Sequence, residues 1–294
     1  MDWGVFAMDM NLDVSVNWEF KDTIFTWLFN NREALLELYN AIRGTDYGPE
    51  ADVLITTLEN VFSHGRRNDL SFVLNDRLVI LIEHQSTLNK NMPLRMLLYI
   101  AMVYEKWLDR HDKGAIFREK MMTIPWPEFI VLYNGVAPMD DEVELKLSDM
   151  FAQHGLKCPV NLELTVRVIN INKGHNEYLA QRSETLNGYE VLVDKFREYG
   201  AVSDNEQAAR QAISFCLENN FLKDFLETHK TEVFKMLLTE WKEEDALKIR
   251  WEEGVEEGME KKAIKIAEKM KDEGMDVSTI ARLTGLAIDD ILRL

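Results

Sequence analysis

Long apolar runs, cysteines and basic residues are all in short supply in this sequence of 294 residues. No uninterrupted apolar segment reaches the roughly 18 residues that a membrane-spanning helix needs. The N-terminal stretch MDWGVFAMDMNLD carries acidic residues where a secretory signal peptide needs a basic start and an apolar centre. We therefore expect a cytoplasmic protein that does not enter a membrane.

The two cysteines, Cys158 and Cys216, lie far apart and lack the spacing of a metal site. Thiols in the cytoplasm stay reduced. We therefore expect two reduced, buried thiols and no disulfide bond.

Basic residues are outnumbered, with 34 Lys and Arg against 51 Asp and Glu, and the formal net charge is -17. This charge opposes indiscriminate binding to polyanions, so nucleic acid would need a local basic surface. The candidate cations flank or follow residues 68–86: Arg66, Arg67, Lys90, Arg95, Lys106, Arg110, Lys113, Arg118 and Lys120. They form either one patch or a set of scattered solvated charges, and the sequence leaves both alternatives open.

Apolar residues make up 46% of the chain, which is enough for a sizeable core. Up to about Gly174, helical spacing alternates with short β-rich segments. Over 18–42 we expect either one helix or two helices with a break at Asn30-Asn31, and a further helix is expected over 92–111. Strands are expected over 53–62, 70–74, 78–85, 128–133 and 161–172, and a short helix over 147–151. Residues 1–174 should therefore form a mixed α/β domain.

Beyond Gly174 the patterns are helical. We expect residues 175–241 to form a helical region packed on the first domain, and residues 242–294 to form a charged helix and a C-terminal helical hairpin. Gly254 and Gly258 should weaken the charged helix, because each glycine costs about 1 kcal/mol relative to alanine.

The last segment, DVSTIARLTGLAIDDILRL, predicts two short helices that turn at Thr284-Gly285. Ser278 is the expected N-cap of the first helix. The segment has the outline of a helix-turn-helix, but a plain helical hairpin has the same pattern. We favour the plain hairpin.

The stretch NDLSFVLNDRLVILIEHQS places Glu83, His84 and Gln85 at the end of the apolar run LVILI. Uncompensated polar groups are costly in such a place, so this is either a site or a strand end that emerges into water. Side chains alternate between the two faces of a strand, so Glu83 and Gln85 share one face. His84 points the other way, where we expect a hydrogen-bonded core histidine.

The two apolar runs around NDR predict an antiparallel hairpin, and its loop decides whether a second acid joins Glu83. With a three-residue loop, Asn75 to Arg77, Asp69 lies opposite Glu83. With a two-residue loop, Asp69 lies opposite Ile82 and on the other face. Two carboxylates side by side repel each other unless a cation lies between them. Mg²⁺, with Mn²⁺ as a substitute, prefers such oxygen ligands, although acids at strand ends are also ordinary.

These residues carry a resemblance to known nucleases. RNDLSFVLNDRLVILIEHQS resembles the core of the PD-(D/E)XK nuclease superfamily, in which an Asp begins one strand and Glu-x-Lys ends the next. From about Lys21 to the C-terminus, the chain also resembles the Rpn family of recombination-promoting nucleases, which are also called transposases. The blocks that carry this resemblance are LIEHQSTLNKNMPLRMLLYIAMVYEKW, PEFIVLYNG, LKLSDMF, VININKGHN, FLKDFLETHKTEVFKMLLTEW and EEGVEEGMEKKAIKIAEKM.

The resemblance implies a metal-dependent DNA endonuclease that hydrolyses phosphodiester bonds and serves recombination or transposition. It implies an α/β fold, a restriction-endonuclease-like mixed sheet flanked by helices, followed by an all-helical C-terminal region. Asp69 and Glu83 would be Mg²⁺ ligands, and Gln85 would occupy the superfamily's lysine position. Asp22 matches an acidic position on the family's first helix, as an extra ligand or a residue that positions water, and Glu19 is the nearby alternative.

Gln85 departs from the superfamily, although members of the closer family often carry Gln here as well. An amide has no charge and cannot act as a base near neutral pH. Loss of a general catalyst can cost roughly 100- to 10,000-fold in rate, so a slow enzyme is expected. Arg95, on the following helix, is the candidate for returning the missing positive charge. Thr26 stands where relatives often carry a Lys. The residues expected to contact DNA are Arg66, Arg67, Lys90 and Arg95.

Two other functions remain open from the sequence. The nuclease fold could be catalytically inactive, with C-terminal helices that assemble oligomers or bind a partner. A DNA-binding regulator that uses the terminal hairpin is the weaker alternative, because that hairpin has only Arg282 and Arg293 as strong cations. For the nuclease we expect a homodimer through the C-terminal helical region, since cutting both strands of DNA requires two sites.

Overall fold

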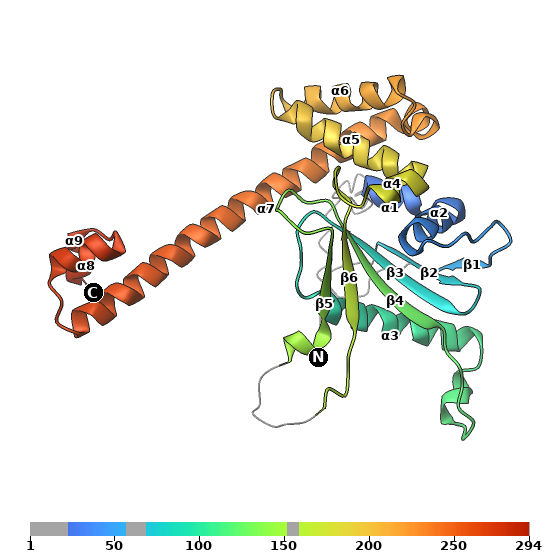
Figure 1. Ribbon diagram of the computed structural model, residues 1–294, viewed down its shortest axis with the longest axis horizontal. Coiled ribbons are helices and arrows are strands. Elements are labelled where there is room, and N and C mark those ends of the chain that lie inside the picture. Colours follow the sequence, from blue (N-terminus) through green and yellow to red (C-terminus); the bar gives the residue numbers. More distant parts are fainter. Residues whose placement is uncertain (1–22, 57–68, 152–158, 294) are drawn as a thin grey trace, which may run out of the picture. The chain divides into compact units, whose positions relative to one another are not determined.

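The computed structural model describes residues 23–56, 69–151 and 159–293 (Figure 1). The chain divides into two compact units, Met1–Met236 and Leu237–Leu294. Every helix in the described ranges is too short or too polar to span a lipid bilayer.

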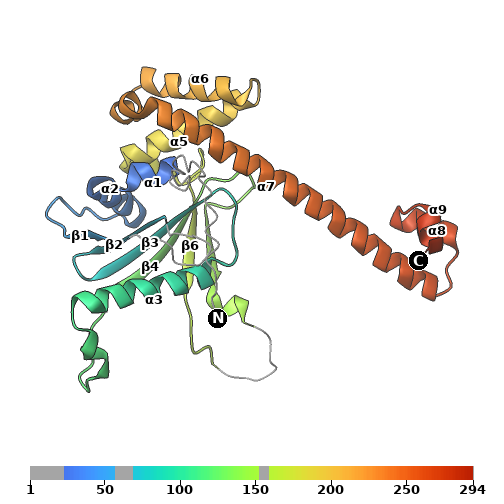
Figure 2. The same ribbon diagram turned by 180° about the vertical axis from the view of Figure 1, so that it is seen from behind.

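A six-stranded sheet forms the centre of the first unit, in the order β1-β2-β3-β4-β6-β5 (Figure 1; Figure 2 gives the view from behind). The strands are β1 (Val53–Ile55), β2 (Leu70–Leu74), β3 (Leu78–Gln85), β4 (Trp126–Tyr133), β5 (Glu142–Lys146) and β6 (Thr165–Asn170). The central strands β3, β4 and β6 are parallel, whereas the pairs β1–β2, β2–β3 and β5–β6 are antiparallel. This confirms the expected mixed sheet.

The hairpin of β2 and β3 has a three-residue loop. Leu74 pairs with Leu78, which leaves residues 75–77 as the connection. Asn75 and Asp76 have left-handed φ angles of 51° and 50°, which Asn and Asp tolerate better than most other residues. Of the two loop lengths that the sequence left open, the three-residue loop is therefore the one present, and it gives the register on which the candidate metal site depends.

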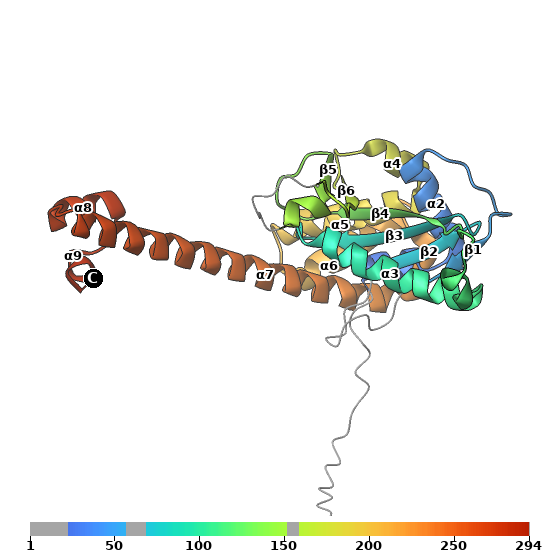
Figure 3. The ribbon, with the colours of Figure 1, turned by 90° about the horizontal axis from the view of Figure 1, so that it is seen from below.

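One face of the sheet is covered by α3 (Met92–Arg110), which is followed by the short 3-10 helix η1 (Lys113–Phe117) (Figure 3). Tyr99 of α3 belongs to the same buried core cluster as Val79 and Leu81 of β3. Odd-numbered side chains of β3 therefore point toward α3, as period-two alternation requires.

Helices α1 (Ile24–Phe29) and α2 (Arg32–Arg43) belong to the other side of the sheet. Phe25 of α1 stacks on His84 of β3, with 4.7 Å between the ring centroids, so even-numbered side chains of β3 point this way. Asn31 is the N-cap of α2, and its side chain accepts a backbone hydrogen bond. Of the two alternatives for this segment, two helices with a break are therefore present.

Three segments differ from the sequence expectations or extend past the described chain. The strand expected over 53–62 is present as Val53–Ile55, and its residues from 57 onward lie outside the described part. Strand β5 was not expected, because its side chains alternate between exposed and half-buried positions and EVELK contains no apolar run. The helix expected over 147–151 is the 3-10 helix η2 (Leu147–Met150).

Three helices follow the sheet: α4 (Glu177–Arg182), α5 (Glu184–Gly200) and α6 (Asn205–Glu218). Gly188 of α5 allows a close approach of Leu222, since a Cβ atom at Gly188 would lie 2.6 Å from Leu222 Cγ. Cys216 of α6 is a buried free thiol, as expected, whereas Cys158 lies outside the described residues.

The long helix α7 (Lys223–Asp272) contains Gly254 and Gly258, as expected, and has non-helical angles at His229, with φ -120° and ψ 22°. That the two glycines weaken the helix stays a prediction. The flanking residues are mostly Glu, Lys, Met and Ala, whose high helix propensity offsets the cost of two glycines.

The second unit ends with α8 (Val277–Thr284) and α9 (Ile288–Arg293). Ile280 and Ile291 of these helices form a small buried core with Ala267. Gly285 terminates α8 with a left-handed φ of 76°, so the expected turn is confirmed.

The N-cap of α8 is Asp276 and not Ser278, which corrects the sequence prediction. Asp276 Oδ1 accepts a hydrogen bond from the backbone N–H of Thr279 at 3.0 Å. Asp and Ser are about equally good N-caps. The helix therefore starts at the earlier of the two candidates.

Candidate metal centre

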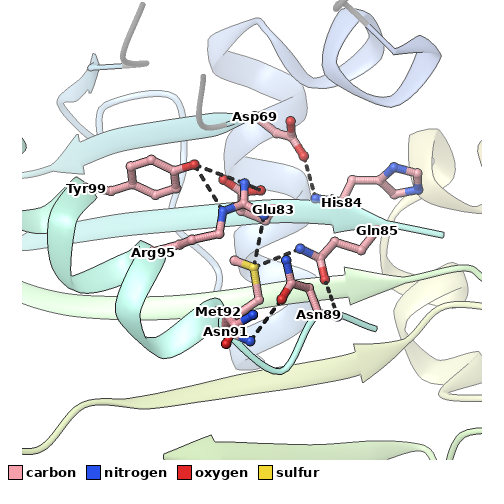
Figure 4. A network of polar contacts seen from close by, with 9 residues as sticks. All are labelled: Asp69, Glu83, His84, Gln85, Asn89, Asn91, Met92, Arg95 and Tyr99. Carbon is pink, nitrogen blue, oxygen red and sulfur yellow. Dashed lines mark hydrogen bonds and ion pairs between the residues drawn. The ribbon is translucent and has the colours of Figure 1, made fainter. Parts of the chain in front are cut away.

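Glu83 is a buried carboxylate near the end of β3, with only 3% of its surface exposed. Its Oε2 atom accepts a hydrogen bond from Arg95 Nη2 at 2.9 Å (Figure 4). Arg95 lies in the first turn of α3, the helix toward which odd-numbered side chains of β3 point. The hairpin and the next helix thus bring a negatively charged and a positively charged side chain together inside the protein.

Arg95 is itself held in place by Tyr99, one helical turn further along α3. Its Nη2 and Nε atoms donate to Tyr99 Oη at 3.0 Å and 3.3 Å. Residues four apart lie on the same face of a helix, so the spacing of Arg95 and Tyr99 in the sequence could have indicated this contact. The guanidinium is therefore oriented from two sides.

Asp69 directly precedes β2, at the position opposite Glu83 in the register that the hairpin adopts. Its Oδ2 atom accepts a hydrogen bond from the backbone N–H of His84 at 2.6 Å (Figure 4). One oxygen of each acid is thus fixed by a protein donor.

The two carboxyl groups influence each other. Burial raises the pKa of Glu83, and the charge of Asp69 raises it further, whereas Arg95 acts in the opposite direction. Burial also raises the pKa of Asp69, against the hydrogen bond from the backbone of His84. Two full negative charges are therefore unfavourable here near neutral pH, and a divalent cation would relieve their repulsion.

The donor set fits a hard cation. Glu83 Oε1 is buried and has no hydrogen-bond partner within the described residues, and such an atom costs about 1–3 kcal/mol if it stays unpaired. Mg²⁺ is commonly bound through one or two carboxylates and keeps several waters. In the ranges that the structure describes, no group of three or more His, Cys, Asp or Glu side chains is placed to hold a metal. Asp69 and Glu83 are therefore the two ligand candidates, and Asp22 and Glu19 lie outside the described residues.

Gln85 lies on the same side of β3 as Glu83, but its amide is engaged elsewhere. Nε2 donates to Met92 Sδ at 2.8 Å, and Oε1 accepts from the backbone N–H of Asn89 at 3.3 Å (Figure 4). Within the described chain, no hydrogen bond joins this amide to Asp69 or Glu83. The contact with Met92 was not expected, because sequence spacing does not show where a sulfur atom from the next helix will lie.

His84 is the hydrogen-bonded core histidine that its position in the strand predicts. Its Nε2 atom lies 2.9 Å from Tyr189 Oη of α5, and its ring stacks on Phe25. Burial lowers its pKa to about 3, and Arg197 contributes to this shift. His84 is therefore neutral near pH 7 and faces away from the carboxylates.

The basic residues expected at DNA are only partly described. Arg66 and Arg67 lie outside the described residues, Lys90 is exposed in the loop between β3 and α3, and Arg95 is paired with Glu83. Thr26, the position where relatives often carry a Lys, lies on α1, and its hydroxyl is 3.1 Å from that of Thr23. The described part therefore places Lys90 and Arg95 at the same end of α3.

Comparisons with known proteins identify both parts of the chain. Residues 75–186 match the family model described as "Putative transposase, YhgA-like", a range that includes Glu83, Gln85 and Arg95 but not Asp69. Residues 260–294 match the model described as "Rpn/YhgA-like nuclease family, C-terminal HTH domain". Neither a curated protein nor a solved structure matches.

The second match supports a helix-turn-helix at the end of the chain, in place of the plain hairpin that we favoured from the sequence. The two interpretations share α8, the turn at Gly285 and α9, so the spacing of apolar residues does not separate them. The match also supports DNA binding.

The family names together support a role in nucleic-acid cleavage or recombination. The two matches cover half of the chain, and the chain belongs to the Rpn/YhgA-like family of nucleases and transposases.

Proposed function

We propose that this protein is a Mg²⁺-dependent DNA endonuclease that hydrolyses phosphodiester bonds in recombination or transposition, with Mn²⁺ as a possible substitute. The single observation that carries the proposal is the buried Glu83 Oε1 atom, which lacks a partner among the described residues and lies beside a second acid, Asp69. A divalent cation bound there would polarise the phosphate and lower the pKa of a water ligand.

Asp69, Glu83 and Gln85 would have different roles in such a site. Asp69 and Glu83 would hold the ion, each keeping one oxygen on a protein donor and offering the other. Gln85 lacks a proton to give or take at neutral pH, so the chain itself supplies no general base at the lysine position. This supports the expectation of a slow enzyme.

DNA as the substrate is supported by the family names and by the C-terminal helix-turn-helix. The net charge of -17 means that the field of the whole chain does not attract DNA. Binding should therefore depend on local contacts by Lys90 and, beyond the described residues, by Arg66 and Arg67.

The decisive experiment is nicking of supercoiled plasmid by the full chain with Mg²⁺ or Mn²⁺. We expect Asp69→Ala to lower the nicking rate about 100-fold, because the site loses half of its carboxylate ligands while the removed side chain lies at a strand end. Asp140→Ala, which changes an exposed loop residue of the same type, is the matched control and should nick like the wild type. Equal nicking by all three proteins would exclude the catalytic proposal.

A catalytically inactive nuclease fold is the alternative, and one observation favours it. Arg95 already compensates the charge of Glu83 without any metal. A fold that had lost catalysis could keep this ion pair without a metal. In that case Mn²⁺ would neither bind nor stabilise the protein, and the plasmid would stay intact.

We also propose a homodimer through the second unit. Leu283, Ile288 and Leu292 are 57%, 51% and 60% exposed there, so this small unit presents apolar side chains to solvent. Light scattering during gel filtration should give twice the chain mass of 34.3 kDa. Leu283→Lys/Leu292→Lys should reduce the mass to that of one chain, whereas Val202→Lys, at an equally apolar exposed site in the first unit, should not. A wild type that elutes as a monomer would contradict this proposal.

A further inference from the structure

The lysine position of this site holds an uncharged side chain, yet the carboxylates are not without a cation. Arg95 Nη2 lies 2.9 Å from Glu83 Oε2, and only 20% of the Arg95 side chain and 4% of the Glu83 side chain are exposed. Attraction between charges is stronger when water is largely excluded. The positive charge therefore comes from the helix that follows β3, and not from β3 itself.

A single sulfur atom connects this charge to the glutamine. Met92 Sδ accepts from Gln85 Nε2 at 2.8 Å and from Arg95 Nη1 at 3.4 Å (Figure 4). Gln85 Oε1 also accepts from the backbone of Asn89, just before α3 begins. The hydrogen bonds of Gln85 thus connect the end of β3 to the first turn of α3, and Arg95 lies in that turn.

The contact with Arg95 fixes the orientation of the Glu83 carboxylate. Arg95 occupies Oε2, so the rotation of the carboxylate is fixed and Oε1 remains without a hydrogen bond within the described chain. A buried ion pair is weak grounds for stability, because desolvation offsets its attraction. Glu83 also has a hydrogen bond with the Tyr99 side chain, so Oε1 is the unpaired atom of this carboxylate within the described residues. An unpaired buried acceptor carries a desolvation penalty, and a role as a metal ligand would account for that cost.

We propose that Arg95 supplies the fixed positive charge of this site and positions Glu83, and that Gln85 is a positioning residue that acts on Arg95 through Met92. This inference rests on the proposed metal-dependent function. Arg95 and Gln85 would together perform the task that a single lysine performs in the superfamily pattern. Arg95 gives the charge and Gln85 gives its placement.

The test measures Mn²⁺ binding to the full chain by titration calorimetry, alongside plasmid nicking. Arg95→Met keeps an unbranched apolar stem and removes the charge, and Arg95→Lys keeps the charge. Mutation of a residue that orients a metal ligand typically costs 10- to 100-fold in metal affinity. We expect a loss of about that size for Arg95→Met and less than about tenfold for Arg95→Lys. Arg110→Met, an exposed arginine on the same helix, is the control and should bind like the wild type.

A charge relocation tests the role of Gln85. Gln85→Lys alone should lower the nicking rate, because the contacts with Met92 and Asn89 that place Arg95 are lost and the new charge would lie near Arg95. In Gln85→Lys/Arg95→Met the relocated lysine should restore part of the nicking that Arg95→Met loses. An increase of tenfold or more in Gln85→Lys alone would overturn the inference.

The binding data separate this inference from the proposed function. Unchanged Mn²⁺ affinity in Asp69→Ala would remove the metal site altogether. Loss of affinity in Asp69→Ala with wild-type affinity in Arg95→Met would keep the metal site and overturn the role of Arg95. If circular dichroism shows that Arg95→Met does not fold, Arg95→Gln replaces it, because it keeps a donor for Glu83 without the charge.

Discussion

Glu83→Gln should lower metal-dependent DNA cleavage about a thousandfold. The amide has the size of the carboxylate but lacks its negative charge, and the remaining acid would face the cation alone. A bound metal contributes several kcal/mol of transition-state stabilisation, and each 1.36 kcal/mol corresponds to a factor of ten in rate. The effect of Glu83→Gln on the rate should exceed that of Asp69→Ala, because Glu83→Gln also removes the charged partner of Arg95.

Plasmid nicking and thermal unfolding with and without Mn²⁺ check this result. A cation that binds only the folded protein raises the melting temperature, so Mn²⁺ should stabilise the wild type and not Glu83→Gln. Glu144→Gln, an exposed acid on β5, is the matched control and should behave like the wild type in both assays. Folded Glu83→Gln that still cleaves at the wild-type rate would rule out Glu83 as a metal ligand.

Gly135→Ala should destabilise the fold by about 3 kcal/mol or more, the range expected when a buried position is overpacked against rigid backbone. A Cβ atom at this position would lie 1.9 Å from the backbone oxygen of Ser86 and 2.5 Å from Tyr133 Oη. The neighbouring backbone N–H of Asn134 donates to Gln85 O at 3.0 Å. The ends of β3 and β4 would therefore be forced apart next to the candidate site.

Urea unfolding followed by circular dichroism measures this change. Gly200→Ala is the control, because a Cβ atom there would lie 3.9 Å from its nearest neighbour, Ala208 Cβ, an ordinary contact at the end of a helix. Its effect should stay within about 1 kcal/mol. A Gly135→Ala protein as stable as Gly200→Ala would mean that the two strand ends can separate freely.

The parts of the fold that the sequence predicted well have local causes. The break before α2 follows from Asn30-Asn31, and Asn31 caps the new helix. Pro93 lies in the first turn of α3, where a missing N–H costs nothing. The β2–β3 hairpin was predicted with its loop length left open, and Asn75 and Asp76 in that loop accept left-handed angles. In each case the deciding residues lie within a few positions of the structure that they produce.

The parts that the sequence missed depend on distant partners or on nearly equal local choices. β5 is a strand because it pairs with β6, as in Glu144 with Arg167, and its own pattern is weak. Asp276 and Ser278 are both good N-caps, so composition does not choose between them. The helix-turn-helix became distinguishable from a hairpin through the family comparison and not through apolar spacing.

In the candidate site, too, the features with local causes could be predicted, and those that depend on distant contacts could not. Alternation along β3 and the hairpin register predicted that Glu83 could meet a second acid, and Arg95 was named as the source of a missing charge. The link from Gln85 to Arg95 through Met92 Sδ was beyond sequence reasoning. It depends on how α3 packs against β3, and a methionine in an apolar helix carries no local sign of such a role.

The two kinds of strand pairing around β3 differ greatly in the length of chain that they enclose. Leu74 and Leu78 meet across a tight turn, whereas Leu78 and Trp126 meet after the whole crossover through α3. Short loops close first, since closure entropy grows with loop length. During synthesis the hairpin can therefore bring Asp69 and Glu83 opposite each other before α3 and β4 bury them.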